Sequence, residues 1–193
     1  YKRQSLIPVG EAPESLSKKQ NDFCEIRLVD ADGNDVADGE PGELAIRGPS
    51  VFSGYWGNDA ANQEAFRGGW LPMGDVFRRN EDGALDFVDR VNYMIKSGGE
   101  NIYPAEIEQH IMRDERILDV AVVRKSHEKW GEVPVVFAAR SDQALTPEDV
   151  IDICRGRIAN YKLPKEVHFI EMDDLPRSTS GKIQRHILEE RLR

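Results

Sequence analysis

The sequence predicts an α+β protein in two parts: a small β-barrel-like part, followed by a compact α+β domain with a small sheet and flanking helices. Short strands separated by Gly- and Pro-rich turns fill the chain from about residue 23. After residue 90 amphipathic helices alternate with strands that have the composition of buried ones. The change of character lies at VDRVNYMIKSGG, residues 88–99, and indicates a domain boundary there.

The first part opens with a polar, poorly periodic segment, so 1–22 is expected to be irregular. Residues 23–89 are β-rich. CEIRLVD alternates polar and apolar side chains before the turn ADGN. Glu43–Arg47 is a second short strand, and DGALDFVDR is a third after an Asp-Gly turn. Strands and turns at this spacing predict a small barrel or sheet.

The second part, 90–193, has the order helix, strand, strand, helix, strand, helix. Pro104 begins the first helix, and two isoleucines four positions apart share one of its faces. LDVAVVRK, VPVVFAAR and EVHFIEM are the strands, and Thr146 is the N-cap of the second helix. Residues 183–192 form a last amphipathic helix. This order predicts an α+β unit of about 100 residues.

Composition excludes several classes of protein. Charged residues make up 32% and hydrophobic residues 39% of the chain, and no apolar run is long enough to span a membrane. No secretory signal opens the chain, and the two cysteines are expected to stay reduced in a cytoplasmic protein. Cys24, Cys154 and the four histidines match no disulfide or zinc spacing, so no metal site is expected. The net charge is −9 and no basic stripe dominates, which argues against nucleic-acid binding.

Two stretches carry groups that suit a nucleotide or another phosphorylated ligand. Asp75, in GGWLPMGD, is expected on a turn, where it would bind ribose hydroxyls or cap its own backbone. Arg90 lies just before the predicted boundary. Gly98 and Gly99 permit either the close approach of a ligand or a hairpin turn.

A third group combines aromatic and basic side chains in the second part. Trp130 and Tyr161 could stack on a base, and Lys162 or Lys165 could contact phosphate. The alternative is that the aromatic rings pack against the domain and the lysines are solvated.

A fourth stretch, DLPRSTSGKIQR, places Lys182 among small residues. A Walker-type P-loop would need Gly at position 176 and Ser or Thr after the lysine, but Pro176 and Ile183 occupy these places. Lys182 is therefore either a phosphate-directed lysine outside a P-loop or a solvated residue at a helix N-terminus capped by residues 178–180.

Taken in order, these stretches resemble the core motifs of the adenylate-forming (ANL) superfamily of acyl-CoA synthetases, luciferases and peptide-synthetase adenylation domains. The resemblance covers roughly residues 24–190 and is carried by GELAIRGPSVFSGYW, GGWLPMGD, DRVNYMIKSGGENIYPAEIE and LPRSTSGKIQR. The family's upstream phosphate loop and aromatic-Gly-x-Thr-Glu motif do not occur here. The resemblance implies that 23–89 ends a large N-terminal domain and that 90–193 is the mobile C-terminal domain, with the hinge near 90–92. A first residue that is Tyr and not Met agrees with a C-terminal fragment.

By resemblance, the full protein is an AMP-forming acyl-CoA ligase. A carboxylic acid attacks Mg-ATP to give an acyl-adenylate, and coenzyme A then displaces AMP. The resemblance implies that Lys182 is catalytic and binds ATP and AMP together with Asp75 and Arg90, that Asn92 is the hinge, and that Mg²⁺ is carried by the nucleotide. The residues implied for coenzyme A are Ser97, Gly98, Gly99, Glu100, Trp130, Tyr161, Lys162 and Lys165.

Two positions depart from the family pattern. Met73 stands where relatives usually have Thr before Gly-Asp, and Asn92 stands where relatives usually have Asp or Lys. Two alternatives remain open: an adenylation domain that loads a carrier protein, and a non-catalytic interaction module. The form SGGEN is more similar to acyl-CoA synthetases, such as those of fatty acid metabolism.

The resemblance also implies partners. These are the carboxylic acid, ATP, coenzyme A and the protein's own missing N-terminal domain. A lysine acetyltransferase acting on Lys182 is a hypothesis that rests on the exposed, small-residue setting of this lysine. The 193-residue chain alone is expected to be inactive.

Overall fold

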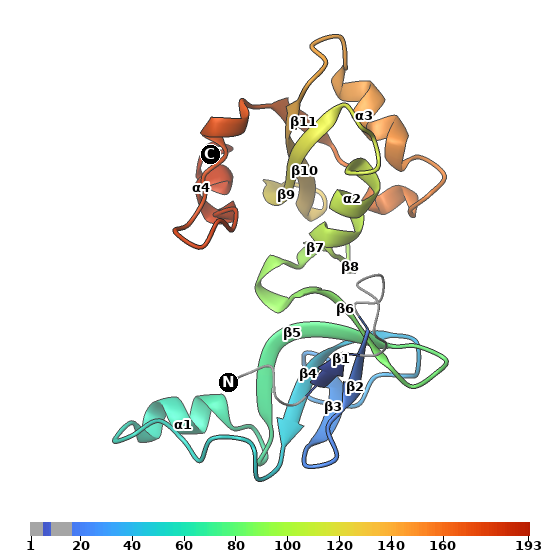
Figure 1. Ribbon diagram of the computed structural model, residues 1–193. Coiled ribbons are helices and arrows are strands. Elements are labelled where there is room, and N and C mark those ends of the chain that lie inside the picture. The colour runs from blue at the N-terminus through green and yellow to red at the C-terminus, as the bar shows by residue number, and fades with distance from the viewer. Residues whose placement is uncertain (1–5, 9–16) are drawn as a thin grey trace. The chain divides into compact units, whose positions relative to one another are not determined.

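The computed structural model describes residues 6–8 and 17–193. The chain divides into two compact units, Tyr1–Asn92 and Tyr93–Arg193 (Figure 1). The division falls inside the 3₁₀ turn Val91–Tyr93, immediately after the 90–92 stretch expected to contain the hinge. Each unit has its own sheet, and the α+β class is confirmed.

The first unit is built on a six-stranded sheet in the order β1-β2-β6-β5-β4-β3, in which every neighbouring pair is antiparallel. A helix lies between β4 and β5, and Asn58 caps its N-terminus by accepting from the Ala61 amide. The elements are β1 (Leu6–Pro8), β2 (Lys18–Gln20), β3 (Glu25–Val29), β4 (Pro41–Arg47), α1 (Asp59–Ala65), β5 (Leu71–Arg79) and β6 (Leu85–Arg90).

Two expectations for this unit are corrected. Among the described residues no pairing joins β1 to β3, so the sheet is open and is not a closed barrel. Closure requires strands long enough to tilt and stagger, and β1 and β2 have three residues each. The assignment of 1–22 as irregular is wrong at these two strands, which are too short for an alternating pattern to reveal them. The other residues up to 16 lie outside the described part of the chain.

Met73 belongs to the apolar core of the first unit. Its side chain is 7% exposed and packs in a cluster with residues of β3, β4, β5 and β6, including Leu28, Leu44 and Leu85. The residue that departs from the family pattern is therefore held by packing, and it points into the sheet's core.

The second unit is built on a five-stranded sheet. Strand β10 pairs along its length with β9 on one side and runs parallel to β11 on the other, and the hairpin β7–β8 joins at its start through Gly131 and Ser97. The elements are β7 (Ile95–Ser97), β8 (Glu100–Ile102), α2 (Pro104–Ile111), β9 (Ile117–His127), β10 (Gly131–Arg140), α3 (Pro147–Cys154), β11 (Glu166–Phe169) and α4 (Arg185–Glu190). The structure thus has the predicted order from α2 to α4, preceded by the hairpin that was one of the two alternatives for Gly98 and Gly99.

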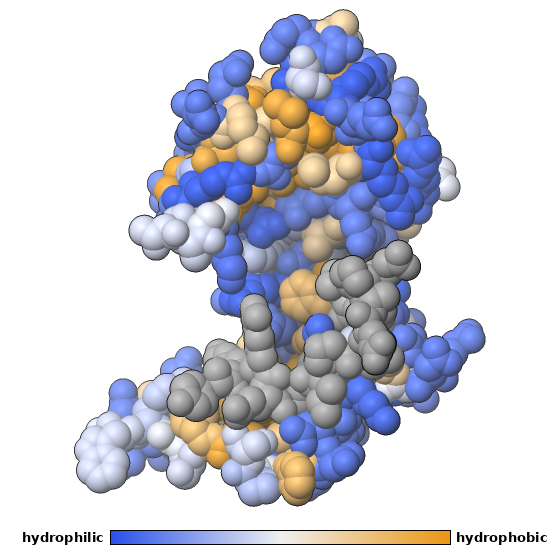
Figure 2. Space-filling model, in the orientation of Figure 1, coloured by the Kyte–Doolittle hydropathy of each residue, from blue (hydrophilic) through white to orange (hydrophobic). Residues whose placement is uncertain are grey.

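The sheet of the second unit is covered on both faces because β9 and β10 are apolar on both. Val122 and Val136 pack with α2 and α3, whereas Val123 and Val135 pack with Leu188 of α4. In Figure 1, α4 lies on one side of the strands, and α2 and α3 lie on the other. Figure 2 shows apolar side chains of this unit surrounded by hydrophilic ones.

Within residues 6–8 and 17–193, no helix combines the length and apolarity needed to cross a membrane. Over the same residues, no three His, Cys, Asp or Glu side chains are grouped so that they could hold a metal ion. Cys24 and Cys154 are free and buried, and burial raises the pKa of the Cys154 thiol to about 11.

A prediction concerns the turn between α2 and β9. Side-chain hydrogen bonds from Arg116 lower the pKa of Asp114 from 3.8 to about 2. Because the folded pKa lies below the unfolded value of about 3.9, the stabilisation is fully present above about pH 4 and is lost as pH falls towards 2. Asp114→Asn should therefore lower the melting temperature at pH 7, and its difference from the parent should shrink between pH 4 and pH 2.

Thermal unfolding followed by circular dichroism measures this effect. Asp173→Asn is the matched control, because Asp173 is exposed in the same unit and forms no ion pair with the other described residues. Identical melting of Asp114→Asn and the parent at every pH would show that the Arg116 pair does not stabilise the fold.

Candidate functional site

Asp75 lies within β5, so its expected place on a turn is wrong. Gly74 has φ 72° and lies at a bulge, where the β4 partner changes from Glu43, opposite Val76, to Ala45, opposite Pro72. The Gly74 amide donates to Glu43 Oε1 at 3.0 Å. A glycine in the left-handed region signals either a turn or a bulge, and here the bulge interrupts the regular alternation of the strand next to Asp75.

Arg90 is the cross-strand partner of Asp75. The two residues are directly paired in the β5–β6 register, and Arg90 Nε lies 3.4 Å from Asp75 Oδ1. The side chains are 55% and 28% exposed respectively, so both keep free surface. A carboxylate can accept from a diol, and a guanidinium can donate to phosphate or to a ribose oxygen. The structure therefore brings together two of the predicted nucleotide-binding residues.

Gly98 and Gly99 form the two-residue turn of the β7–β8 hairpin. Their φ angles are 60° and 90°, which is the conformation of a type I′ turn, and Ser97 pairs with Glu100. The Gly98 amide donates to the Trp130 carbonyl at 2.8 Å. A Cβ at Gly98 would lie 2.8 Å from Cε3 of the Trp130 ring. Gly98 thus serves both the turn and the contact with Trp130.

Six of the eight residues expected to bind coenzyme A line one hollow in the second unit. The hollow has a volume of about 160 Å³. Trp130 and Tyr161 are each 42% exposed, so their rings offer apolar surface to a ligand. Lys165 and Glu100 bring one positive and one negative group. The six residues are Ser97, Gly98, Glu100, Trp130, Tyr161 and Lys165.

Lys162 and Gly99 are not among the residues that line the hollow. The Lys162 ammonium donates to both oxygens of Glu106 at 3.0 and 2.7 Å, and the lysine side chain is 16% exposed. This ion pair ties the 3₁₀ turn Asn160–Lys162 to α2. Contact between Lys162 and a ligand phosphate would require this pair to break.

Lys182 follows a three-residue hairpin loop, so of its two alternatives the capped helix N-terminus is excluded. Ser178 N donates to Lys182 O at 2.9 Å, Gly181 N donates to Ser178 O at 2.8 Å, and Gly181 has φ 79°. This is a turn closed by a left-handed glycine, which is a common form of three-residue loop. Helix α4 begins three residues after Lys182, with Gln184 as its N-cap residue. The lysine itself is exposed.

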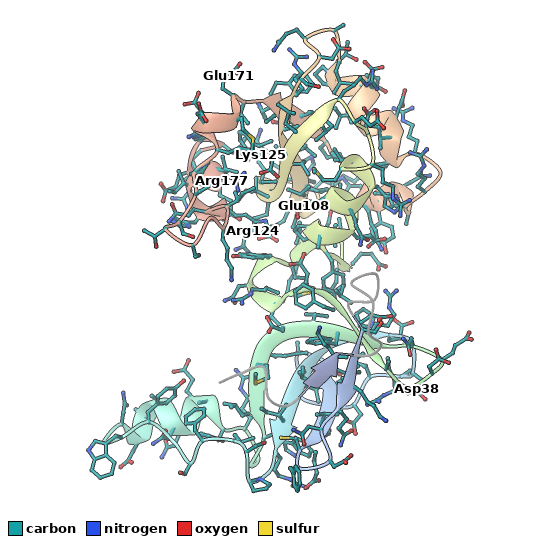
Figure 3. The ribbon with its side chains drawn as sticks, in the orientation of Figure 1. Asp38, Glu108, Arg124, Lys125, Glu171 and Arg177 are labelled. Carbon is teal, nitrogen blue, oxygen red and sulfur yellow. The ribbon has the colours of Figure 1, made fainter. Side chains whose placement is uncertain are left out.

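The reasoning from sequence missed the two arginines that hold this hairpin. Arg177 contacts the Gly181 carbonyl and Asp119, and Arg185 contacts Glu108. Figure 3 labels Arg177 on the segment before α4 and Glu108 on α2. Both arginines are visible in LPRSTSGKIQR, but their acidic partners lie 58 and 77 positions away in the sequence. Local pattern contains no signal for such pairs.

Asn92, the expected hinge, lies in the 3₁₀ turn Val91–Tyr93 and is exposed. No non-glycine residue in the described part of the chain has a positive φ. Asn92 is therefore not in the left-handed conformation that asparagine tolerates, and the conformation seen here does not require asparagine.

Comparison with known families gives two matches. The family described as AMP-binding enzyme C-terminal domain matches residues 106–182, which lie in the second unit. The family described as AMP-binding enzyme matches residues 10–56, which lie in the first.

Curated relatives agree with these matches. The chain is 43% identical over 166 residues to a long-chain-fatty-acid–CoA ligase of Yersinia pestis, which covers 86% of the chain and 29% of the relative. It is 41% identical over 186 residues to a 2-succinylbenzoate–CoA ligase of Bacillus velezensis, which covers 96% of the chain and 36% of the relative. The chain therefore spans about a third of the length of these relatives.

Solved structures give the same result. ATP-bound MatB from Rhodopseudomonas palustris matches with a TM-score of 0.80 and 30% identity, over 89% of this chain and 34% of that one. The o-succinylbenzoate CoA synthetase MenE from Bacillus subtilis, in complex with its acyl-adenylate, matches with a TM-score of 0.78 and 34% identity over the same shares.

A prediction tests the contact between Gly98 and Trp130. Both Gly98→Ala and Gly99→Ala place a side chain at positive φ, which costs about 1–2 kcal/mol. Only Gly98→Ala also meets the Trp130 ring, because nothing lies within 4 Å of a Cβ at Gly99. We expect Gly98→Ala to lose more stability than Gly99→Ala in urea unfolding and to change the tryptophan emission of the native state. Equal stability losses with unchanged emission would contradict the packing of Trp130 on Gly98.

Proposed function

The chain belongs to the AMP-binding enzyme family, and from this premise we propose that it is the C-terminal part of an ATP-dependent acyl-CoA ligase. The full protein would activate a carboxylic acid as acyl-AMP and transfer the acyl group to coenzyme A. The observation that supports this proposal most is that the second unit contains two groups suited to the two half-reactions. An exposed lysine on a short hairpin and an apolar hollow with a glycine turn lie in one compact body.

In the first half-reaction, a carboxylate oxygen attacks the α-phosphorus of Mg-ATP, and pyrophosphate leaves. Both reactants are anionic, and the developing negative charge needs a fixed cation. We assign this role to Lys182, whose exposed ammonium forms no ion pair within residues 17–193. Asp75 would accept hydrogen bonds from the ribose hydroxyls, and Arg90 would donate to ribose or phosphate.

In the second half-reaction, the thiol of coenzyme A attacks the acyl carbonyl, and AMP leaves with the electron pair of the broken C–O bond. The hollow suits the thin pantetheine arm because its volume is only about 160 Å³. Trp130 and Tyr161 offer apolar walls, and Lys165 offers a cation to a phosphate of the nucleotide end. Between the two steps, rotation about the segment at Asn92 would move Lys182 away from the reacting acyl group and bring the hollow to it.

The choice of acid lies outside this chain in the proposed protein. Relatives with 43% and 41% identity are named for a long-chain fatty acid and for 2-succinylbenzoate, although each matches most of this chain. A fatty acid is thus one of several candidate substrates, and a role in fatty acid metabolism would follow only if it is the substrate used. We also propose a cytoplasmic location, in keeping with the two cysteines that match no disulfide spacing and are free in the structure.

Replacement of Lys182 tests the proposed function. In the full-length protein, Lys182→Ala should lower pyrophosphate exchange by roughly 10²–10³-fold, because one preorganised charge-stabilising group is lost. Thioester formation from supplied acyl-adenylate should survive. Lys165→Ala is the matched control and should show the reverse pattern, with normal exchange and a raised KM for coenzyme A. If Lys182→Ala slowed both half-reactions equally, the assignment of Lys182 to the adenylation step would be wrong.

A second test concerns the proposed hinge. Proline at position 92 fixes φ near −65° and restricts Val91, so φ of residue 92 could no longer change between the two steps. Asn92→Pro should keep one half-reaction, and we expect adenylation to be the survivor, whereas Asn92→Ala should keep both. The measurement is pyrophosphate exchange beside thioester formation from preformed acyl-adenylate. A folded proline variant with both parental rates would place the pivot elsewhere in 89–97.

A further inference from the structure

The hairpin that carries Lys182 is fastened on both sides by an arginine. Arg177 precedes the loop and is the bridge partner of Ile183, so the two strands of the hairpin face each other at this point. Arg185 follows the loop and begins α4. The lysine side chain is exposed and has a long flexible stem, so its place is set by the backbone that carries it.

Arg177 braces the peptide bond to which Lys182 is attached. Its Nη1 donates to the carbonyl oxygen of Gly181 at 3.0 Å, and that carbonyl belongs to the Gly181–Lys182 peptide. Its Nη2 donates to Asp119 Oδ2 on β9. Asp119 is held in turn, because its Oδ1 accepts from the Val120 amide at 2.8 Å. One guanidinium therefore connects the loop to the sheet.

Arg185 fixes the other end of the segment more deeply. Its Nη2 donates to both oxygens of Glu108 at 2.7 and 2.8 Å, and its Nε donates to the Val122 carbonyl at 3.2 Å. The side chains of Arg185 and Glu108 are 16% and 17% exposed. Removal of Arg185 would take the cation away from a nearly buried carboxylate and would disturb the fold. Arg177, at 35% exposure, can be replaced with less harm to the fold.

We propose that Arg177 is a positioning residue for Lys182: it holds the Gly181–Lys182 peptide against Asp119, so that the ammonium meets the reacting phosphate in a fixed place. This inference rests on the proposed function, because only the proposed function gives Lys182 a reaction step in which the position of its ammonium matters. Arg177 acts through the lysine and need not touch the substrate. A misplacement of about 1 Å in a reacting group can cost about 10²-fold in rate, so loosening this hairpin should slow the adenylation step.

The experiment is a double-mutant cycle in the full-length protein. Arg177→Ala should lower pyrophosphate exchange by about 10- to 100-fold and leave thioester formation from supplied acyl-adenylate unchanged. The double variant Arg177→Ala/Lys182→Ala should show the same exchange rate as Lys182→Ala alone, because a positioning residue has no effect once the group that it positions is absent. Arg177→Lys should fall between the parent and Arg177→Ala, since an ammonium cannot span both partners as a planar fork does.

Two controls separate positioning from stability. Arg155→Ala makes the same charge change at the C-cap of α3, where Arg155 pairs with Glu148 and Asp152, and should leave both half-reactions at the parental rate. Asp119→Asn should show a weaker form of the Arg177→Ala pattern. Thermal melting of each variant should show that all are folded at the assay temperature.

The outcomes distinguish the two proposals. If Lys182→Ala leaves pyrophosphate exchange unchanged, the proposed function fails and the role of Arg177 fails with it. If Lys182→Ala impairs exchange but the loss from Arg177→Ala multiplies with it in the double variant, only the positioning inference is overturned. The same holds if Arg177→Ala slows both half-reactions equally.

Discussion

The carboxylate of Glu108 is the point on which the second unit depends. Its Oε1 accepts from the Val122 amide at 2.8 Å, and both of its oxygens accept from Arg185. A carboxylate that is 17% exposed would be costly without these partners. The Glu108 carboxylate accepts the hydrogen bond of a β9 amide that points away from β10. Through this amide and Arg185 it links α2, β9 and α4. The guanidinium of Arg185 also lies 4.3 Å from the ring centroid of Tyr93, the first residue of the unit.

Several of the residues proposed to bind ligands in this unit lie in turns or directly after them, among them Gly98, Gly99 and Lys182. The strands and helices are occupied in packing on two faces of one sheet, and their side chains are committed to those cores. The glycine hairpin and the Lys182 hairpin project from this body and are each fixed by hydrogen bonds to it. Short loops on a rigid scaffold are where binding groups are generally placed.

The sequence allowed the local features to be predicted and failed at long-range ones. Pro104 and Thr146 were correctly placed at helix starts, and Thr146 forms a capping box with Asp149. Asp75 was predicted on a turn and lies in a strand, because a glycine such as Gly74 is equally typical of a turn and of a β-bulge. The pairs of Arg177 with Asp119 and of Lys162 with Glu106 join residues far apart in the chain, and hydrophobic periodicity does not encode such partners. Among the residues of the hollow, Trp130, Tyr161 and Lys165 were grouped by their residue chemistry, whereas Ser97 and Glu100 were added only through the family resemblance.

The rigidity of the second unit bears on how one protein could run two half-reactions. Lys182 and the hollow beside Gly98 are attached to the same sheet, the first through Arg177 and Asp119 and the second through the contact of Gly98 with the Trp130 carbonyl. Neither can move far without breaking these bonds. If Lys182 serves adenylation and the hollow serves thioester formation at the same acyl group, the exchange between them must move the unit as a whole. The torsions that change would then lie outside the network, in the few residues before Tyr93.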